Sequence, residues 1–403
     1  MLRVLRGSRV VLGVSGGIAA YKTVELVREL TRGGAVVDVI LTRAAREFIT
    51  PLTFQTLTRR PVHTEVFEGW TDDARGHISL GEDADVMVVA PATADVIARL
   101  ATGLADDMLT VTALACTAPL VIAPAMDHHM YLHPATQQNL QTLRNRGALI
   151  VGPDQGPLAS GLIGYGRLVP VARIVDHVRA ALGANGRLAG SRVVVTAGPT
   201  RESLDPIRFI SNRSSGKMGY AVAEAALDAG AQVTLITGPT ALTPPATATV
   251  VAVETAGEMY DAVERTVDGA DALIMTAAVA DYRPATVAEH KIKKTEEDLV
   301  LSLVRTADIL ASIRRPGLVK VGFAAETTSV IDYARAKLRA KDLDLIVANE
   351  ARSTMGSDES AAYLIRHGAE PVAVGPAAKS DVAEAIIDRV AELIAARRTT
   401  VAG

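Results

Sequence analysis

One pattern of apolar strand, glycine-containing loop and helix occurs twice along this chain. It opens at residues 8–13 and again at residues 191–196, and a second apolar run follows the helix in both places, at residues 36–42 and 232–237. Short apolar runs that alternate with helical segments are typical of parallel sheets with helices on both faces. We therefore expect an α/β fold of two Rossmann-like three-layer domains with mainly parallel sheets. Ligands are expected beyond the carboxyl ends of the strands.

The length of the chain also favours two domains, because 403 residues are more than a single hydrophobic core usually accommodates. A short polar, glycine-rich stretch at residues 183–190 is the best candidate for a linker. The predicted domains are accordingly residues 1–182 and residues 191–403.

Composition excludes several classes of function. A formal net charge of −3 gives no bulk attraction to nucleic acid or to an anionic membrane. No window approaches the roughly 18 uncharged apolar residues of a membrane span, and the N-terminal residues do not resemble a signal peptide. The single cysteine, Cys116, cannot form an internal disulfide, so a reducing cytoplasm is the expected compartment.

Residues 211–219, Ser-Asn-Arg-Ser-Ser-Gly-Lys-Met-Gly, lie between an apolar strand and a predicted helix. The free N–H groups and positive dipole end of a helix start favour anions. Small residues let a ligand approach the backbone, and Arg213 and Lys217 add positive charge. The plain alternative is an ordinary connection with a serine cap, but nine consecutive residues of this character favour an anion site.

Other loops that contain small, polar and charged residues follow predicted strands in each half. In the front half these are residues 15–22, 90–95, 103–110 and 124–131. If the sheet is parallel, these loops converge at one edge of it.

In the rear half, residues 277–284 end a buried strand and close with a fixed turn, and a lysine-rich run follows at residues 290–294. Phe323 is expected at a strand-to-helix junction, where it could pack on a base. Lys337 and Lys341 are four residues apart and share a helix face. Each feature alone is more often a solvated surface; together they suit triphosphate binding.

The front motifs (Gly-Gly-Ile-Ala-Ala-Tyr-Lys at 16–22, Pro-Ala-Thr-Ala at 91–94 and Ala-Asp-Asp-Met-Leu-Thr at 105–110) resemble those of flavoproteins that decarboxylate cysteine derivatives. With the rear loops included, the chain resembles the bifunctional phosphopantothenoylcysteine decarboxylase/phosphopantothenate–cysteine ligase family of bacterial coenzyme A synthesis. The resemblance extends from about Ser8 to the last helix.

For the front half, the resemblance implies an FMN cofactor held by Gly16, Gly17, Ile18, Thr42, Thr93 and Ala94. It places the family's active-site histidine at His77, which could take a proton while FMN accepts a hydride. Two positions depart from the family. Asp127 stands where the family has an asparagine that contacts the substrate carboxylate, and Ser160 replaces a proton-donating cysteine. A hydroxyl is a weaker acid than a thiol.

For the rear half, the resemblance implies that CTP and Mg²⁺ activate the carboxylate of 4′-phosphopantothenate as an acyl-cytidylate, from which the amine of cysteine displaces CMP. Asn212 would orient the acyl-cytidylate and Lys291 would stabilise the transferring phosphoryl group. The implied contacts to CTP are Met275, Thr276, Ala277, Asp281, Lys291, Ala307, Asp308, Ile309, Leu310, Phe323, Lys337 and Lys341.

The leading hypothesis is thus a bifunctional enzyme whose ligase acts before its decarboxylase to make 4′-phosphopantetheine. An alternative keeps the ligase but treats the front half as a flavin-binding domain with weak or no decarboxylase activity, because of Asp127 and Ser160. A third hypothesis is a binding module, a dinucleotide sensor without catalysis. The resemblance also implies a homo-oligomer, a dodecamer built from trimers and dimers.

Overall fold

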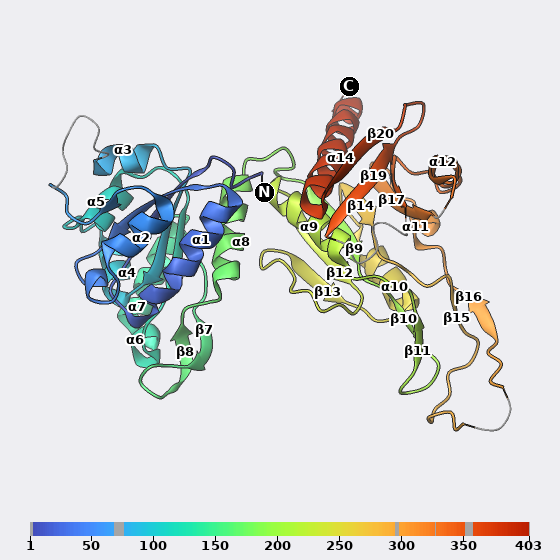
Figure 1. Ribbon diagram of the computed structural model, residues 1–403, viewed down its shortest axis with the longest axis horizontal. Helices are drawn as coiled ribbons and strands as arrows, with labels where there is room; N and C mark the ends of the chain where they lie inside the picture. The colour runs from blue at the N-terminus through green and yellow to red at the C-terminus, as the bar shows by residue number, and fades with distance from the viewer. Residues whose placement is uncertain (1–2, 68–75, 295–297, 327, 351–357, 403) are drawn as a thin grey trace. The chain divides into compact units, whose positions relative to one another are not determined.

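The computed structural model describes residues 3–67, 76–294, 298–326, 328–350 and 358–402. The chain divides into two compact units, Met1–Gly183 and Ala184–Gly403. Each unit is an α/β sandwich around a mainly parallel sheet (Figure 1), so the predicted fold class is confirmed. No helix in the described part of the chain is long and apolar enough to cross a membrane.

The front unit is built on a parallel sheet with strand order β3-β2-β1-β4-β5-β6. Its strands are β1 (Arg9–Val14), β2 (Val36–Leu41), β3 (Val62–His63), β4 (Val86–Ala92), β5 (Leu120–Pro124) and β6 (Leu149–Ile150). The antiparallel hairpin β7 (Asp154–Pro157) and β8 (Ile163–Arg167) lies outside this sheet. Strand β4 is buried along its whole length, as expected for a strand covered on both faces.

Helices cover both faces of the front sheet and give it two core clusters. One cluster joins the sheet to α1, α2 and α8, and the other joins it to α3, α4, α5 and α7. The helices are η1 (Ile18–Lys22), α1 (Thr23–Gly33), η2 (Ala45–Glu47), α2 (Pro51–Thr58), α3 (His77–Glu82), α4 (Ala94–Thr102), α5 (Met108–Ala115), α6 (His128–Leu132), α7 (Pro134–Asn145) and α8 (Val171–Gly183).

The rear unit has an eight-stranded sheet of order β13-β12-β9-β14-β17-β18-β19-β20, parallel up to β18 and antiparallel beyond it. Its strands are β9 (Arg192–Ala197), β12 (Gln232–Thr237), β13 (Thr249–Ala252), β14 (Ala272–Met275), β17 (Val319–Glu326), β18 (Leu345–Glu350), β19 (Glu359–Ile365) and β20 (Val372–Ala378). Two short antiparallel pairs project from it, β10 (Arg201–Ser203) with β11 (Phe209–Ser211) and β15 (Tyr282–Pro284) with β16 (Leu303–Arg305).

One face of the rear sheet packs against two helices, α9 (Lys217–Asp228) and α14 (Lys379–Ala402), which lie side by side (Figure 1). The other face packs against α10 (Ala256–Thr266), α11 (Ile309–Ser312) and α12 (Val330–Ala340). The carboxyl ends of the parallel strands therefore open between helices of both layers, where a ligand site is expected.

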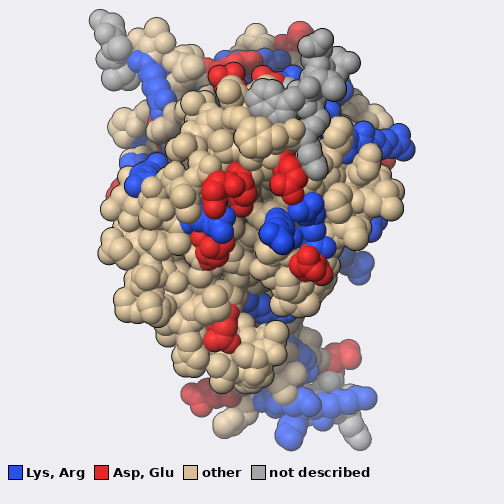
Figure 2. Space-filling model, turned by 90° about the vertical axis from the view of Figure 1, so that its left-hand side faces the viewer, with Lys and Arg blue, Asp and Glu red and all other residues tan. Residues whose placement is uncertain are grey.

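Charges of both signs are mixed over part of the surface. Over the middle of the face drawn in Figure 2, acidic and basic side chains lie interspersed among wide uncharged areas. This mixture of signs on that face agrees with the small formal net charge of −3.

Candidate active sites

A cavity of about 590 Å³ lies beyond the carboxyl ends of β1, β4 and β5 in the front unit. The loop between β7 and β8 closes another side of it. Of the residues predicted from the sequence, six line this cavity: Gly16, Gly17, Ile18, Thr93, Asp127 and Ser160. Its size is that of a pocket for a drug-sized ligand or cofactor.

Ser15 joins the strand ends that form the floor of this cavity. Its hydroxyl donates to the carbonyl oxygen of Pro91 at 2.6 Å and accepts from the backbone N–H of Thr93 at 3.1 Å. Thr93 in turn caps the start of α4 by accepting from the N–H of Val96. The strand-to-helix turn is thus fixed by short polar side chains, as a helix N-terminus requires.

Gly16 and Thr42 act together in shaping the loop. A Cβ added to Gly16 would lie 2.3 Å from the Cβ of Ala44, so only glycine permits this close approach of two backbones. Thr42 is buried, and its hydroxyl accepts from the N–H of Ala45. Thr42 is thus buried, and Ala94 is the first residue of α4; neither residue lines the cavity.

Asp127 and Ser160 form a direct pair across the cavity. The hydroxyl of Ser160 donates to Oδ2 of Asp127 at 2.6 Å, and the N–H of His129 donates to Oδ1 at 3.1 Å. The hydrogen bond from Ser160 is the main reason that the pKa of Asp127 lies below its ordinary value, with the N–H of His129 adding to it. Asp127 is therefore a carboxylate at neutral pH.

Within one chain, His77 does not reach this pair. It is the first residue of α3, which packs against α5, and it does not line the cavity. Figure 1 shows α3 at the opposite end of the front unit from α6 and the β7–β8 hairpin.

Two cationic residues for which the sequence predicts no role, Lys22 and Arg167, also line the front cavity. Burial lowers the pKa of Lys22, and the nearby charge of Arg167 lowers it further. A motif signal existed for both, since Lys22 ends the run at 16–22 and Arg167 ends the strand β8.

A cavity of about 640 Å³ lies at the carboxyl ends of the parallel strands of the rear unit. All the predicted nucleotide contacts except Lys291 line it: Met275, Thr276, Ala277, Asp281, Ala307, Asp308, Ile309, Leu310, Phe323, Lys337 and Lys341. They come from the end of β14, the start of β15, the start of α11, strand β17 and the end of α12.

The charged groups of this cavity are held by one another and by the backbone. Asp308 caps α11 by accepting from the N–H of Ala311, and Nζ of Lys341 lies 2.8 Å from its Oδ2. Nζ of Lys337 donates to the carbonyl oxygen of Phe323 at 2.7 Å. Both ammonium groups are thus oriented before any ligand arrives, which limits the ordering that binding requires.

The carboxyl of Asp308 remains ionised despite its surroundings. Partial burial is the largest influence on its pKa and raises it. The hydrogen bonds from Lys341 and from the N–H of Ala311, with the neighbouring positive charges, nevertheless bring the pKa below its ordinary value.

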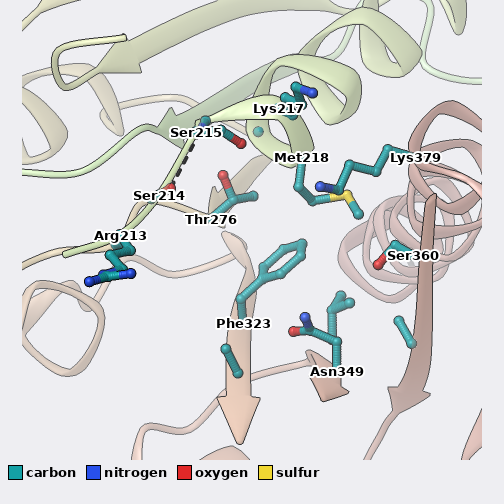
Figure 3. Close-up of a pocket in the computed structure, with 16 residues that line it drawn as sticks. Arg213, Ser214, Ser215, Lys217, Met218, Thr276, Phe323, Asn349, Ser360 and Lys379 are labelled. Atoms are coloured by element: carbon teal, nitrogen blue, oxygen red, sulfur yellow. Dashed lines mark hydrogen bonds between the residues drawn. The ribbon is translucent and has the colours of Figure 1, made fainter. Parts of the chain in front are cut away.

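A second, smaller cavity of about 150 Å³ adjoins the first and shares Thr276, Ala278, Phe323 and Ala325 with it (Figure 3). The loop at residues 213–219 forms one side. Gly216 has a φ of 77° and begins α9 in a left-handed conformation that favours glycine. The predicted helix beside this loop is confirmed, and Lys217, Met218 and Gly219 of its first turn line the cavity.

Three lining residues of the smaller cavity, Asn349, Ser360 and Lys379, were not among the site residues predicted from the sequence. Figure 3 shows Lys379, at the start of α14, extending toward Met218. Burial lowers the pKa of Lys379, and the positive charge of Lys217 lowers it further. Lys217 itself pairs with Asp358 at 2.6 Å.

Asn212 lies at the junction of this loop with the strand ends. Its Nδ2 donates to the carbonyl oxygens of Ala278 and Val279 at 3.2 and 3.1 Å. Both hydrogens of the amide are therefore used by the backbone, and its Oδ1 is the polar atom left for a ligand.

Lys291 is exposed and lies between β15 and β16, outside the cavity lining of its own chain. The segment is anchored next to it, because the N–H of Ile292 donates to the buried carboxylate of Asp205 and the carbonyl oxygen of Ile292 accepts from Arg208. Burial raises the pKa of Asp205, but the hydrogen bonds from Arg208 and from three backbone N–H groups hold it far below its ordinary value.

The expected strand-to-helix junction at residues 321–327 is present, since β17 ends at Glu326 and α12 begins at Val330, with Phe323 inside the strand. One local expectation was wrong. Residues 282–284 form strand β15 and not a fixed turn, because they pair with Leu303–Arg305. This difference depends on a neighbouring strand that local sequence does not reveal.

Comparison with known proteins covers both units. Residues 2–183 match the family model described as Flavoprotein, and residues 188–394 match the model of the DNA/pantothenate metabolism flavoprotein C-terminal domain. The chain is 45% identical over 397 residues to the coenzyme A biosynthesis bifunctional protein CoaBC of Bacillus subtilis (strain 168), covering 96% of this chain and 98% of that protein. It is 48% identical over 371 residues to the CoaBC protein of Escherichia coli (strain K12), covering 89% and 91%. A crystal structure of a CoaBC C-terminal domain is 42% identical and covers 53% of this chain and 98% of its own, with a TM-score of 0.46.

Proposed function

Because this chain belongs to the family of bifunctional coenzyme A biosynthesis proteins, we propose that its two halves catalyse consecutive steps on a phosphorylated pantothenate substrate. The protein is an enzyme of coenzyme A biosynthesis with a ligase and a decarboxylase activity, and the flavoprotein half carries a flavin. The proposed steps are ligation of 4′-phosphopantothenate with cysteine in residues 191–403, then decarboxylation of the product in residues 1–182. Ligation uses CTP, and the flavin is FMN.

The observation that carries the nucleotide assignment is the 640 Å³ cavity, on which predicted contacts from five separate elements converge. Lys337 and Lys341 supply positive charge where phosphoryl transfer gathers negative charge. In the first half-reaction a carboxylate oxygen of the substrate attacks the α-phosphorus of CTP and pyrophosphate leaves. In the second, the amine of cysteine attacks the acyl carbon, CMP leaves with the bonding electron pair, and the amine loses a proton.

The smaller cavity suits the phosphate group of 4′-phosphopantothenate. It combines the start of α9 with Lys379 and Arg213, and it opens into the nucleotide cavity. A substrate that lies across both would bring its carboxylate toward the nucleotide. Oδ1 of Asn212, with its amide held by Ala278 and Val279, could accept a hydrogen bond from the incoming amine.

The front cavity has the size and the small-residue walls that a flavin mononucleotide needs. Gly16, Gly17, Ile18 and Thr93 would hold it; when bound, FMN supplies a hydride acceptor next to the substrate thiol carbon. Asp127 and Ser160 would lie at the reacting end, where Ser160 is the hydroxyl available for proton return. Lys22 and Arg167 would balance the negative charges of the ligands.

Mg²⁺ is proposed to arrive with the triphosphate. No group of three or more His, Cys, Asp or Glu side chains that could hold a metal occurs among the described residues. The ion would therefore be held chiefly by phosphate oxygens and water, as is usual for Mg²⁺ with nucleotides.

His77 and Lys291 both lie outside the cavities of their own chain, which supports a homo-oligomer whose sites are completed by neighbouring copies. We propose the dodecamer of trimers and dimers that the family resemblance implies. The cytoplasm is the proposed compartment, where nucleotide and cysteine are available and a lone cysteine stays reduced.

The test of the ligase assignment is pyrophosphate release from CTP in the presence of 4′-phosphopantothenate, cysteine and Mg²⁺. Wild-type protein should release one pyrophosphate per amide formed. Lys291→Gln should lower the rate at least a hundredfold, because it removes a cation from the transferring phosphoryl group. The visible flavin spectrum of the variant should be unchanged. Retained turnover in Lys291→Gln would remove Lys291 from the mechanism.

The alternative of a weakly active front half is not favoured, because the relatives that match the chain over nearly its whole length are bifunctional. It is decided by CO₂ release from 4′-phosphopantothenoylcysteine. Release at a rate comparable to ligation supports the two-step enzyme, and absence of release with flavin bound supports the alternative.

A further inference from the structure

Lys320 is a buried lysine in the middle of the rear sheet. It lies on β17 beside Leu273 of β14, and only 7% of it is exposed. Lysine is rarely buried unless its ammonium group is paired. The sequence around it, Gly-Leu-Val-Lys-Val-Gly-Phe, reads as an apolar strand and gives no hint of a role.

The ammonium group of Lys320 meets the carboxyl ends of two helices. Its Nζ donates to the carbonyl oxygen of Lys341 at 2.9 Å and to that of Ile313 at 3.4 Å. Lys341 is the C-cap of α12, and Ile313 is the C-cap of α11. Carbonyl groups at helix ends lack partners within the helix, and a cation there is favourable.

These two helices carry one wall of the nucleotide cavity. Asp308 begins α11 and Lys341 ends α12, and their side chains pair at 2.8 Å. The start of α11 is thus joined to the end of α12 by that ion pair. Lys320, on strand β17, hydrogen-bonds to the carboxyl ends of both helices.

We propose that Lys320 is a positioning residue of the ligase. By hydrogen-bonding to the carboxyl ends of both α11 and α12, it sets the distance between the groups on these two helices that contact the nucleotide. It does not touch the ligand itself. This inference rests on the proposed function, because it assigns Lys320 to the nucleotide cavity described above.

The charged neighbours of Lys320 offer a matched control. Asp344 accepts from its backbone N–H at 2.7 Å, and Arg397 pairs with Asp344 from α14. Asp342 and Arg314 also act on its charge. Arg397→Met removes an ion pair next to Lys320 without removing a donor to either helix end. The KM for CTP of Arg397→Met therefore measures the effect of losing a nearby ion pair while the hydrogen bonds to the helix ends are kept.

The experiment compares Lys320→Met with Arg397→Met by steady-state ligation, with CTP varied and the other substrates saturating. In Lys320→Met, KM for CTP and the dissociation constant of CTP should rise roughly tenfold, since two charge-assisted hydrogen bonds are lost. The value of kcat should stay within about twofold, and KM for cysteine should not change. Arg397→Met should leave KM for CTP unchanged.

Three results would overturn the proposal. One is a folded Lys320→Met with wild-type affinity for CTP; another is a rise in KM for all three substrates alike; the third is an equal rise in Arg397→Met. If Lys320→Met does not fold, Lys320→Gln, which keeps N–H donors, decides by the same measurements and should show a smaller rise. Failure of wild-type protein to bind CTP would refute the nucleotide site itself, which is a separate outcome.

Discussion

Asp127 places one negative charge in the front cavity, where the proposed substrate is itself acidic. The carboxylate is stabilised by Ser160 and by the N–H of His129, so its pKa lies below its ordinary value. A substrate carboxylate that lies near it meets a like charge. Asp127→Asn should therefore lower KM for the cysteine-containing substrate roughly three- to tenfold, as measured by CO₂ release.

The pH dependence of this effect follows from the direction of the pKa shift. Because the pKa of Asp127 is lowered, its charge is present throughout the neutral and mildly acidic range and is lost only below the pH at which an ordinary carboxyl group is protonated. The ratio of KM values for wild type and Asp127→Asn should accordingly stay constant between pH 8 and pH 5. Ser160→Ala keeps the charge of Asp127, so its KM should not fall even where loss of the proton-returning hydroxyl lowers kcat. A ratio that collapses within this pH range would show that a group other than Asp127 carries the effect.

At the scale of single elements, the loop before α9 depends on how closely that helix approaches the sheet. A Cβ added to Gly219 would lie 2.3 Å from Oγ1 of Thr276 and 2.6 Å from the Cβ of Ala197. Gly219→Ala should push the start of α9 away from β14 and should destabilise the rear unit by about 1–3 kcal/mol. The ligase should also lose affinity for 4′-phosphopantothenate, by roughly tenfold or more.

A glycine on another helix separates this effect from the general consequence of adding a methyl group. A Cβ on Gly257, in the first turn of α10, would meet only Oγ1 of Thr255, at 3.8 Å. Gly257→Ala should leave ligation unchanged and stability within about 1 kcal/mol. Thermal unfolding and the KM for 4′-phosphopantothenate are the measurements. Equal effects of both substitutions would contradict the packing argument.

The elements that the sequence predicted well are those whose pattern is local. Strands such as β9 and β12 are continuous apolar runs between turn residues, and their parallel pairing follows from the helices that connect them. The hairpins β7–β8 and β15–β16 were missed, because their residues are polar or exposed and their pairing depends on contacts beyond the local sequence. The same reason hid Lys320 and Lys379, whose roles come from the places where distant segments meet.

At the scale of the whole molecule, neither unit depends on the other for its core. The two core clusters of the front unit draw only on residues 5–181, and those of the rear unit draw only on residues 188–394. Each cavity is likewise lined by residues of one unit. Two-domain chains with separate cores commonly fold as separate units.

This separation predicts that the two activities survive division of the chain. Residues 1–183 and 184–403, expressed apart, should each fold and keep kcat/KM for their own reaction within about threefold of the full chain, because no described cavity or core cluster is cut. Mixed at equal concentration with CTP, Mg²⁺, 4′-phosphopantothenate and cysteine, the two pieces should make 4′-phosphopantetheine, after a lag that shortens as their concentration rises. The full chain should show the same lag if the intermediate is released into solution between the two sites. A product burst in the full chain that the mixed pieces cannot match would instead show direct transfer, and loss of either activity on division would contradict the independence of the units.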